Sequence, residues 1–398
     1  MHAQHEGHEG HMQDPSGTLT LFQSDMTLMT GMSVHDPLGG MDMPGWMAHV
    51  MGVARLVWND QGGPSGGDVL ESSNWNMVMA QRRLGPGVFT AMMMNSLEPA
   101  TFHNPGSPEL LQTGEAYQGK ALVDVQHPHD FFMNLSLTYR AAVSAEGAVW
   151  VQVAPVGEPA LGPTPFMHRA SAGENPTAPI GHHWQDSTHI SDEVFTVGGG
   201  WRFAALEASA FHGREPDEHR WNIDTGAPDS YSGRLKLDFG AGLSGQVSYG
   251  YLKQPEELET SSQHRLTASL HYGAAGDGPM AISFIWGRLF EDRGISDSVL
   301  LEGAWQMTRH DQVYGRAEWV EKDFLLLATK ATQGNRVVRV DAYTVGYFRD
   351  FEVVRGLNAG IGGDLTFYAL PSSLTPAYGS SPLSGHVFAR LRWQTFFH

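Results

Sequence analysis

The first 51 residues contain the densest group of metal-ligand side chains in this sequence. Nine of the 18 methionines and six of the 20 histidines fall there. Thioether and imidazole groups suit Cu(I), and imidazole with carboxylate suits Cu(II), nickel or zinc. The candidate ligands are His2, His5, His8, His11, Met26, Met29, Met32, His35, Met41 and Met43. The segment predicts a metal-binding tail, and the alternatives are a solvated tail or an apolar segment packed inside the fold.

Candidate ligands continue into the segment 46–58, where apolar residues alternate with other side chains. One face consists of Trp46, Ala48, Val50, Gly52, Ala54, Leu56 and Trp58, and the other holds Met47, His49, Met51 and Arg55. An apolar face with an aromatic residue at each end is typical of a strand that faces lipid. We expect the second face to line a lumen. Two further methionine pairs, which face either this lumen or the lipid, are Met77 with Met79 and Met92 with Met94.

Two long Gly/Pro-rich stretches, 98–130 and 154–190, hold further imidazoles. Their candidate ligands are His127, His129, His168, His182, His183, Asp186 and His189. If these loops fold into the mouth of a barrel, the imidazoles and the carboxylate of Asp186 complete a metal site. The alternative is that they hydrogen-bond an ordered loop into place.

His189 and Ser191 lie two residues apart at the start of an expected strand, so their side chains share a face. The pair resembles the His-x-Ser segment of outer-membrane phospholipases and lipid A deacylases, in which His activates Ser for attack on an acyl ester. In those families Asn follows the Ser, whereas Asp192 follows it here. A lipid hydrolase is therefore a minor alternative, and we expect no catalysis.

The composition limits the class of protein. Its 43 acidic and 25 basic residues give a formal net charge of −18, which argues against a nucleic-acid partner. Charged residues make up 17%, below the roughly 25% usual for soluble domains. The chain has no cysteine, which excludes disulfides and thiolate-ligated metals. No apolar run approaches the ~18 residues of a membrane helix.

The clearest period in the chain is two. Apolar and polar residues alternate over 230–239 and again over 243–252, with Gly and Ala between the two runs, which predicts an antiparallel hairpin. The same device recurs, and we place sixteen strands, within a range of about 14 to 18. They span about 46–58, 74–83, 88–97, 131–140, 148–153, 191–198, 201–211, 230–239, 243–252, 263–272, 280–290, 298–308, 312–322, 337–348, 357–368 and 385–397.

The connections between these strands alternate strictly between short turns and long loops, as in an outer-membrane barrel. The last strand, 385–397, has an apolar face that ends at Phe397, similar to the assembly signal of bacterial outer-membrane proteins, with His398 following it. We therefore predict an all-β, antiparallel up-and-down barrel over 46–398 in the bacterial outer membrane. Residues 1–45 form a tail or plug, and both termini lie in the periplasm.

The tail phrases His11–Met12 and Met41–Pro44, followed by a barrel with an aromatic end, resemble copper resistance protein B of bacterial copper-resistance operons. The resemblance is one of layout and implies copper, as Cu(I) or Cu(II), bound or exported across the outer membrane. Metal ions, membrane lipid and periplasmic copper-handling proteins are the partners that it implies. The alternative is a general or substrate-specific porin without a metal role, because a sixteen-stranded barrel is wide enough for an aqueous channel.

Overall fold

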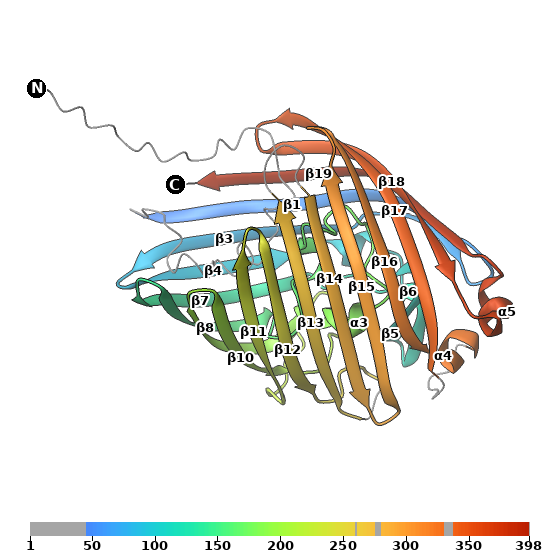
Figure 1. Ribbon diagram of the computed structural model, residues 1–398, viewed down its shortest axis with the longest axis horizontal. Helices are drawn as coiled ribbons and strands as arrows, with labels where there is room; N and C mark the ends of the chain where they lie inside the picture. The colour runs from blue at the N-terminus through green and yellow to red at the C-terminus, as the bar shows by residue number, and fades with distance from the viewer. Residues whose placement is uncertain (1–44, 259–260, 275–279, 330–336, 398) are drawn as a thin grey trace, which may run out of the picture.

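A closed, antiparallel β-barrel forms the body of the molecule (Figure 1). The computed structural model describes residues 45–258, 261–274, 280–329 and 337–397. The ten candidate ligands of the predicted tail lie outside these residues. Among the described helices, none is long and apolar enough to cross a membrane.

The wall consists of sixteen strand positions, as the alternating pattern predicts. They are β1 (Trp46–Gln61), β2 (Gly67–Glu71) with β3 (Asn74–Leu84), β4 (Gly87–Asn95), β7 (Phe132–Ser144), β8 (Gly147–Gly157), β9 (Ser191–Trp201), β10 (Ala204–His212), β11 (Ser230–Gly240), β12 (Leu243–Leu252), β13 (Gln263–Ala274), β14 (Met280–Glu291), β15 (Gly294–Gln306), β16 (Asp311–Asp323), β17 (Val337–Val354), β18 (Leu357–Ala369) and β19 (Leu383–Phe397). β2 pairs with the end of β1 and β3 pairs with its earlier part, so the two together count as one strand position.

The barrel closes where the first and last strands meet. β1 pairs with β19 in antiparallel register from Ala48 opposite Phe397 to Gln61 opposite Ser384. The start of β1 and the end of β19 therefore lie at the same rim, the left side of Figure 1. Closure leaves no free edge in the wall, which is the condition for a sheet to exist in lipid.

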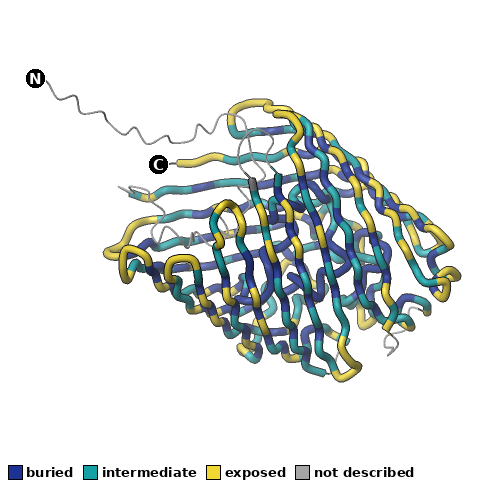
Figure 2. The backbone as a smooth tube through the Cα atoms, viewed as in Figure 1, coloured by how far each residue is buried: buried dark blue, intermediate teal, exposed yellow. Residues whose placement is uncertain are grey.

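Side chains alternate between the two sides of the wall, and Figure 2 shows the alternation of exposure along the strands. On β1, Leu56 and Trp58 are exposed outward while His49 and Arg55 are buried in the lumen, as predicted. On β19, Val387 is exposed outward while Arg390 is buried in the lumen. Exposed Trp46, Trp201 and Trp305 lie near strand ends on the rim of the short turns, where a membrane interface prefers aromatic groups.

The two rims differ in the length of their connections. Tight turns such as 85–86, 145–146 and 241–242 occupy the rim at which the wall begins and ends, and 96–131 and 158–190 leave the other. The predicted strict alternation is wrong at one place. β14 and β15 are joined on the long-loop rim by residues 292–293 alone, because β15 begins earlier than the sequence indicated.

The two longest connections fold into the barrel, and we call segments 96–131 and 158–190 the plug. The first contains α2 (Glu98–Thr101) and a hairpin of β5 (Ser107–Tyr117) and β6 (Lys120–Gln126), which the sequence analysis missed. The second contains η1 (Phe166–His168), α3 (His182–Gln185) and η2 (Ser187–His189). The remaining helices lie on the rim of the long loops: α4 (Phe324–Thr329), η3 (Ser372–Leu374) and α5 (Thr375–Tyr378).

Candidate functional site

Buried ion pairs attach the plug to the wall. Arg169 donates to Asp186 within the plug (2.5 Å) and to Glu302 on β15 (2.6 Å). Four strands further round the wall, Glu174 accepts hydrogen bonds from Arg390 and Arg392 of β19. Because a buried charge is costly without a partner, these contacts stabilise the plug in the position that this structure shows.

A cavity of about 60 Å³ lies between the plug and the wall. Its charged and imidazole groups are Glu71, Glu98, Glu109, Glu115, Asp130, Glu215, His127, His129, His182, His189 and Arg220. Six carboxyl groups face one guanidinium. Burial opposes their ionisation, but neighbouring positive charges hold the pKa of Glu98 and of Glu215 below the ordinary value, so the cavity favours a cation over an anion. The prediction that the histidine loops fold into the barrel is confirmed.

Four imidazoles form a row beside this cavity. The ring centroid of His129 lies 5.6 Å from that of His189, which lies 5.3 Å from His182. His183 continues the row, at 5.5 Å from His182. The two plug segments, far apart in sequence, meet along this row.

His129 and Glu98 form an ion pair at one end of the row, with Nδ1 of the ring 2.8 Å from Oε2 of the carboxylate. Burial works to raise the pKa of Glu98, yet the charge of His129 and the hydrogen bonds from it lower that pKa below its ordinary value. Burial likewise works to lower the pKa of His129, but Glu98 raises it overall. Each partner holds the other in its charged form.

Glu115 and His127 form a different kind of pair, with Oε1 of Glu115 2.6 Å from Nε2 of His127. Burial and the charge of Glu215 raise the pKa of Glu115 to about 8. Burial lowers the pKa of His127 well below its ordinary value. Oε1 of Glu115 and Nε2 of His127 share one hydrogen bond, and Nδ1 of His127 donates to the Pro128 carbonyl at 2.8 Å.

Asp186 acts as an ion-pair partner within the plug. Its Oδ2 accepts a hydrogen bond from Arg169, and its Oδ1 lies 2.6 Å from Nδ1 of His182. Burial opposes its ionisation, but the charges of Arg169 and His182 hold its pKa well below the usual range. Both oxygens are thus occupied by protein groups.

Methionine side chains cover one part of the lumen wall. Met51 on β1 lies opposite Met77 on β3, which lies opposite Met94 on β4. One level towards the short-turn rim, His49 lies opposite Met79, which lies opposite Met92. We call these six residues the methionine patch. Met133 and Met167 pack in the same buried cluster.

The structure settles the direction of the uncertain methionines. Met77, Met79, Met92 and Met94 are at most 7% exposed and face the lumen, whereas Met93 is 37% exposed on the outside. His49 is 3% exposed, and neither of its ring nitrogens has a hydrogen-bond partner. His168 packs its ring 4.7 Å from that of Trp75 beside this cluster. Met47 also lies on the lumen side of β1, by the alternation of the strand.

The His–Ser arrangement of a lipid hydrolase is absent from this plug. The Ser191 hydroxyl donates to the Thr188 carbonyl at 3.0 Å, and Nδ1 of His189 lies 2.8 Å from the Asp186 carbonyl. The other ring nitrogen of His189 is buried without a hydrogen-bond partner. His189 therefore does not activate Ser191 in this structure.

None of the six carboxyl groups of the cavity was among the predicted ligands, and three of them pair with histidines: Glu98, Glu115 and Glu215. Each lies in a segment with no local repeat or ligand spacing. They reach the histidines only because α2 and β5 of the first plug segment and the β10–β11 loop (213–229) fold against the second plug segment. Ligand density around His127 was the one signal that pointed to this place.

The closed wall, its two unequal rims and its outward apolar side define a porin-like outer-membrane β-barrel, and the protein lies in a bacterial outer membrane. No protein-family model and no curated protein matches the chain. The predicted likeness to copper resistance protein B is therefore not shown.

Solved structures share the fold at low identity. The anion-selective porin from Comamonas acidovorans has a TM-score of 0.55 at 10% identity, covering 88% of this chain and 100% of its own. OmpF of Salmonella typhi in complex with daunomycin has 0.53 at 10%, covering 88% and 97%. OprB of Pseudomonas putida has 0.50 at 10%, covering 88% and 94%. At such identities the likeness concerns the fold alone.

Proposed function

We propose that this protein is a substrate-selective outer-membrane channel in which the plug, rather than the width of the wall, controls passage. The observation that carries the proposal is the position of the plug inside a porin-like barrel. Buried plug residues such as Leu111 and Trp184 pack against Leu289 and Val320 of the wall, so the plug occupies space that an open channel would leave to water. A general diffusion pore is a poorer fit to this interior.

The preferred solute is a small cation. The carboxyl groups of the 60 Å³ cavity far outnumber its guanidinium. A cleft of one charge sign with low-dielectric walls concentrates ions of the opposite sign. The proposed cation preference is the opposite of the anion selectivity that the name of the Comamonas porin states for that protein.

Conductance in planar bilayers tests the channel. The matched variant replaces the β5–β6 hairpin, residues 107–126, with a short Gly/Ser linker. β4 and β7 pair directly with each other, so the wall does not need this hairpin. We expect a small conductance from the full chain and one several-fold larger from the variant. Equal conductance of the two proteins would contradict control by the plug.

A soft metal ion is the second candidate solute, and the methionine patch favours it. Thioethers with an imidazole form a ligand set suited to Cu(I), and His49 offers two unpartnered nitrogens directly opposite Met79. Copper would then pass from the tail, if the tail binds it, to ligands of similar type on β1. The alternative role of the patch is apolar packing against plug residues Phe166 and Met167.

Competition for Cu(I) with a chromogenic chelator distinguishes these roles. One variant carries Met77→Leu, Met79→Leu, Met92→Leu and Met94→Leu, which keep the apolar volume and remove the thioethers. A second carries Leu at Met26, Met29, Met32, Met41 and Met43, and Met93→Leu on the outer face is the control. We expect weaker Cu(I) binding in the first two variants and no change in the control. Unchanged affinity and cellular copper tolerance in both would remove the copper role and leave the channel.

A further inference from the structure

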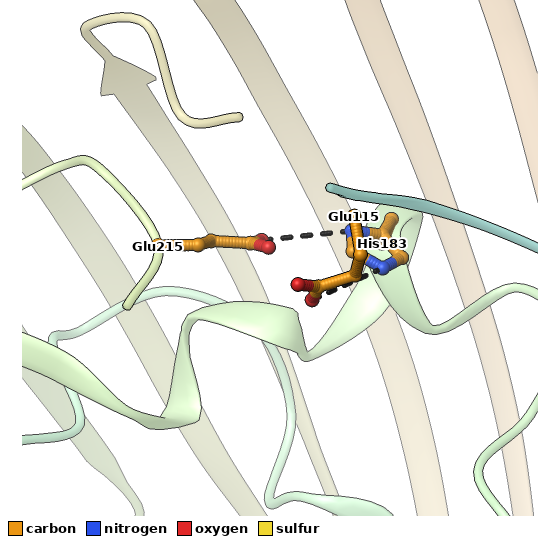
Figure 3. Close-up of side chains that lie close together, drawn as sticks. All are labelled: Glu115, His183 and Glu215. Carbon is orange, nitrogen blue, oxygen red and sulfur yellow. Dashed lines mark ion pairs between the residues drawn. The ribbon is translucent and has the colours of Figure 1, made fainter. Parts of the chain in front are cut away.

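We infer that Glu115, His183 and Glu215 form a binding site for a borderline divalent cation such as Zn²⁺, at which three separate loops meet (Figure 3). Glu115 belongs to β5, His183 to α3 and Glu215 to the β10–β11 loop. The site is distinct from the methionine patch in place and in ligand type. It does not depend on passage of a solute through the barrel.

The three ligand atoms lie within 4.8 Å of one another. Nδ1 of His183 is 3.5 Å from Oε1 of Glu215, and Nε2 is 3.9 Å from Oε1 of Glu115. Ligands about 2.0 to 2.2 Å from a tetrahedral ion lie about 3.3 to 3.6 Å apart. Because one ion takes only one ring nitrogen, the carboxylate next to that nitrogen moves little. The other carboxylate, up to 4.8 Å away, has to move by more than about an ångström, which a Glu side chain achieves by rotation.

His183 is the observation that points to a ligand. It is 3% exposed, and neither of its ring nitrogens has a hydrogen-bond partner. A buried imidazole ordinarily satisfies both nitrogens, because an unmet polar group costs free energy. Oε1 of Glu215 is likewise buried without a hydrogen-bond partner. An ion bound to one ring nitrogen and to the carboxylates satisfies that nitrogen and Oε1 of Glu215 together.

The backbone beside Glu115 holds the imidazole in place. Gly114 has a φ of +122°, and a Cβ there would lie 2.6 to 2.7 Å from three ring atoms of His183. Only glycine lets the strand approach the ring so closely. His127, whose Nε2 lies 2.6 Å from Oε1 of Glu115, orients that carboxyl as an outer partner of the site.

The surrounding charges favour a divalent cation. Glu256 adds a carboxylate oxygen 4.0 Å from Nδ1 of His183. Arg220 lies 3.6 Å from Oε2 of Glu115, but it is also held by Asp130 at 3.1 Å. One imidazole and two carboxylates suit Zn²⁺ and its neighbours in the first transition row, whereas Cu(I) prefers thioethers.

Zinc titration of the purified full-length barrel tests the site. The background carries Gln at His2, His5, His8 and His11, so that the tail does not mask one equivalent of metal. After removal of metal with a chelator, the protein is titrated with Zn²⁺ alone. We expect one tight equivalent in this background, lost or weakened more than about 100-fold by His183→Gln and by Glu215→Gln. His219→Gln, an exposed histidine of the same β10–β11 loop, is the matched control.

Folding and function are scored separately. Heat-modifiable migration reports whether each variant forms the barrel. Gly114→Ala is a second test of zinc binding, because the added methyl group displaces the ring of His183 without removing a ligand. The proposal is overturned if His183→Gln keeps the same zinc stoichiometry and affinity, or if the background binds no tight zinc. Loss of zinc with unchanged conductance supports the site and leaves the channel proposal to its own test.

Discussion

Val345 and Thr344 are neighbours on β17 whose side chains lie on opposite sides of the wall. Val345 is 58% exposed near the middle of the strand, and the Thr344 hydroxyl contacts that of Thr366 at 2.8 Å. We expect Val345→Arg to reduce folding yield in lipid vesicles far more than Thr344→Arg, because an arginine near the bilayer midplane costs about 2 to 4 kcal/mol. Heat-modifiable migration measures the yield. Equal tolerance at the two positions would contradict the assignment of faces.

The Glu98–His129 pair predicts a pH dependence of stability. The raised pKa of His129 contributes stability below its unfolded value of about 6.5, and this is lost as pH rises through the folded pKa. The lowered pKa of Glu98 contributes above about 4.5 and is lost as pH falls. Their joint contribution is largest between these limits.

The measurement compares the wild type with His129→Gln by urea unfolding at about pH 5.5 and pH 9. We expect the variant to lose about 1 to 3 kcal/mol at the lower pH and less at the higher one. His219→Gln, at an exposed ring, is the control. A difference that does not shrink towards pH 9 would show that the ion pair is not its cause.

Single residues were the hardest part of this protein to predict. Over 46–58, β1 has polar groups on one side only, so the lumen direction of His49 followed from the alternation. β3 and β4 carry apolar groups on both sides, so the alternation did not show whether Met77 and Met94 face the lumen or the lipid. The wall facing the plug is itself apolar there, which removes the usual contrast between the two faces.

At the scale of elements, the plug segment 158–190 contacts the wall closely enough to be locked to it. The Ser171 hydroxyl lies 2.6 Å from that of Ser283 on β14. The chain has no cysteine, so Ser171→Cys with Ser283→Cys introduces a single disulfide. We expect the oxidised variant to conduct less than its reduced form, because the plug must shift for a solute to pass. The two single-cysteine variants are the controls, and no effect of reduction would show that passage needs no movement of 158–190.

Strands of the wall were predictable and the hairpin inside it was not. A strand between lipid and lumen must alternate, and residues 230–252 show that requirement directly. β5 and β6 are surrounded by protein and pair irregularly, with breaks in register near Thr113. Buried Leu110 and Leu111 follow each other there without alternation, so no period distinguishes the hairpin from a loop.

For the molecule as a whole, the acidic cavity predicts cation selectivity. In bilayers with a salt gradient, the reversal potential of the full chain should have the sign of cation preference. The preference should fall between about 0.1 M and 1 M salt, because the screening length shortens from about 10 to 3 Å. Glu98→Gln with Asp130→Asn should reduce it near pH 7, and Glu146→Gln on an outer turn should not. Anion preference would contradict the proposed solute.

The seam between β1 and β19 joins the two ends of the described wall. Pairing of segments so distant in sequence is entropically the most expensive step, so it comes late in assembly. Both plug segments precede β9 in the chain and are therefore available before the wall can close. Glu174 of the plug is gripped by Arg390 and Arg392, which belong to the closing strand itself. We therefore expect the plug to act as a template for closure. It offers the final strand a charged binding site and helps to set the circumference at which the barrel closes.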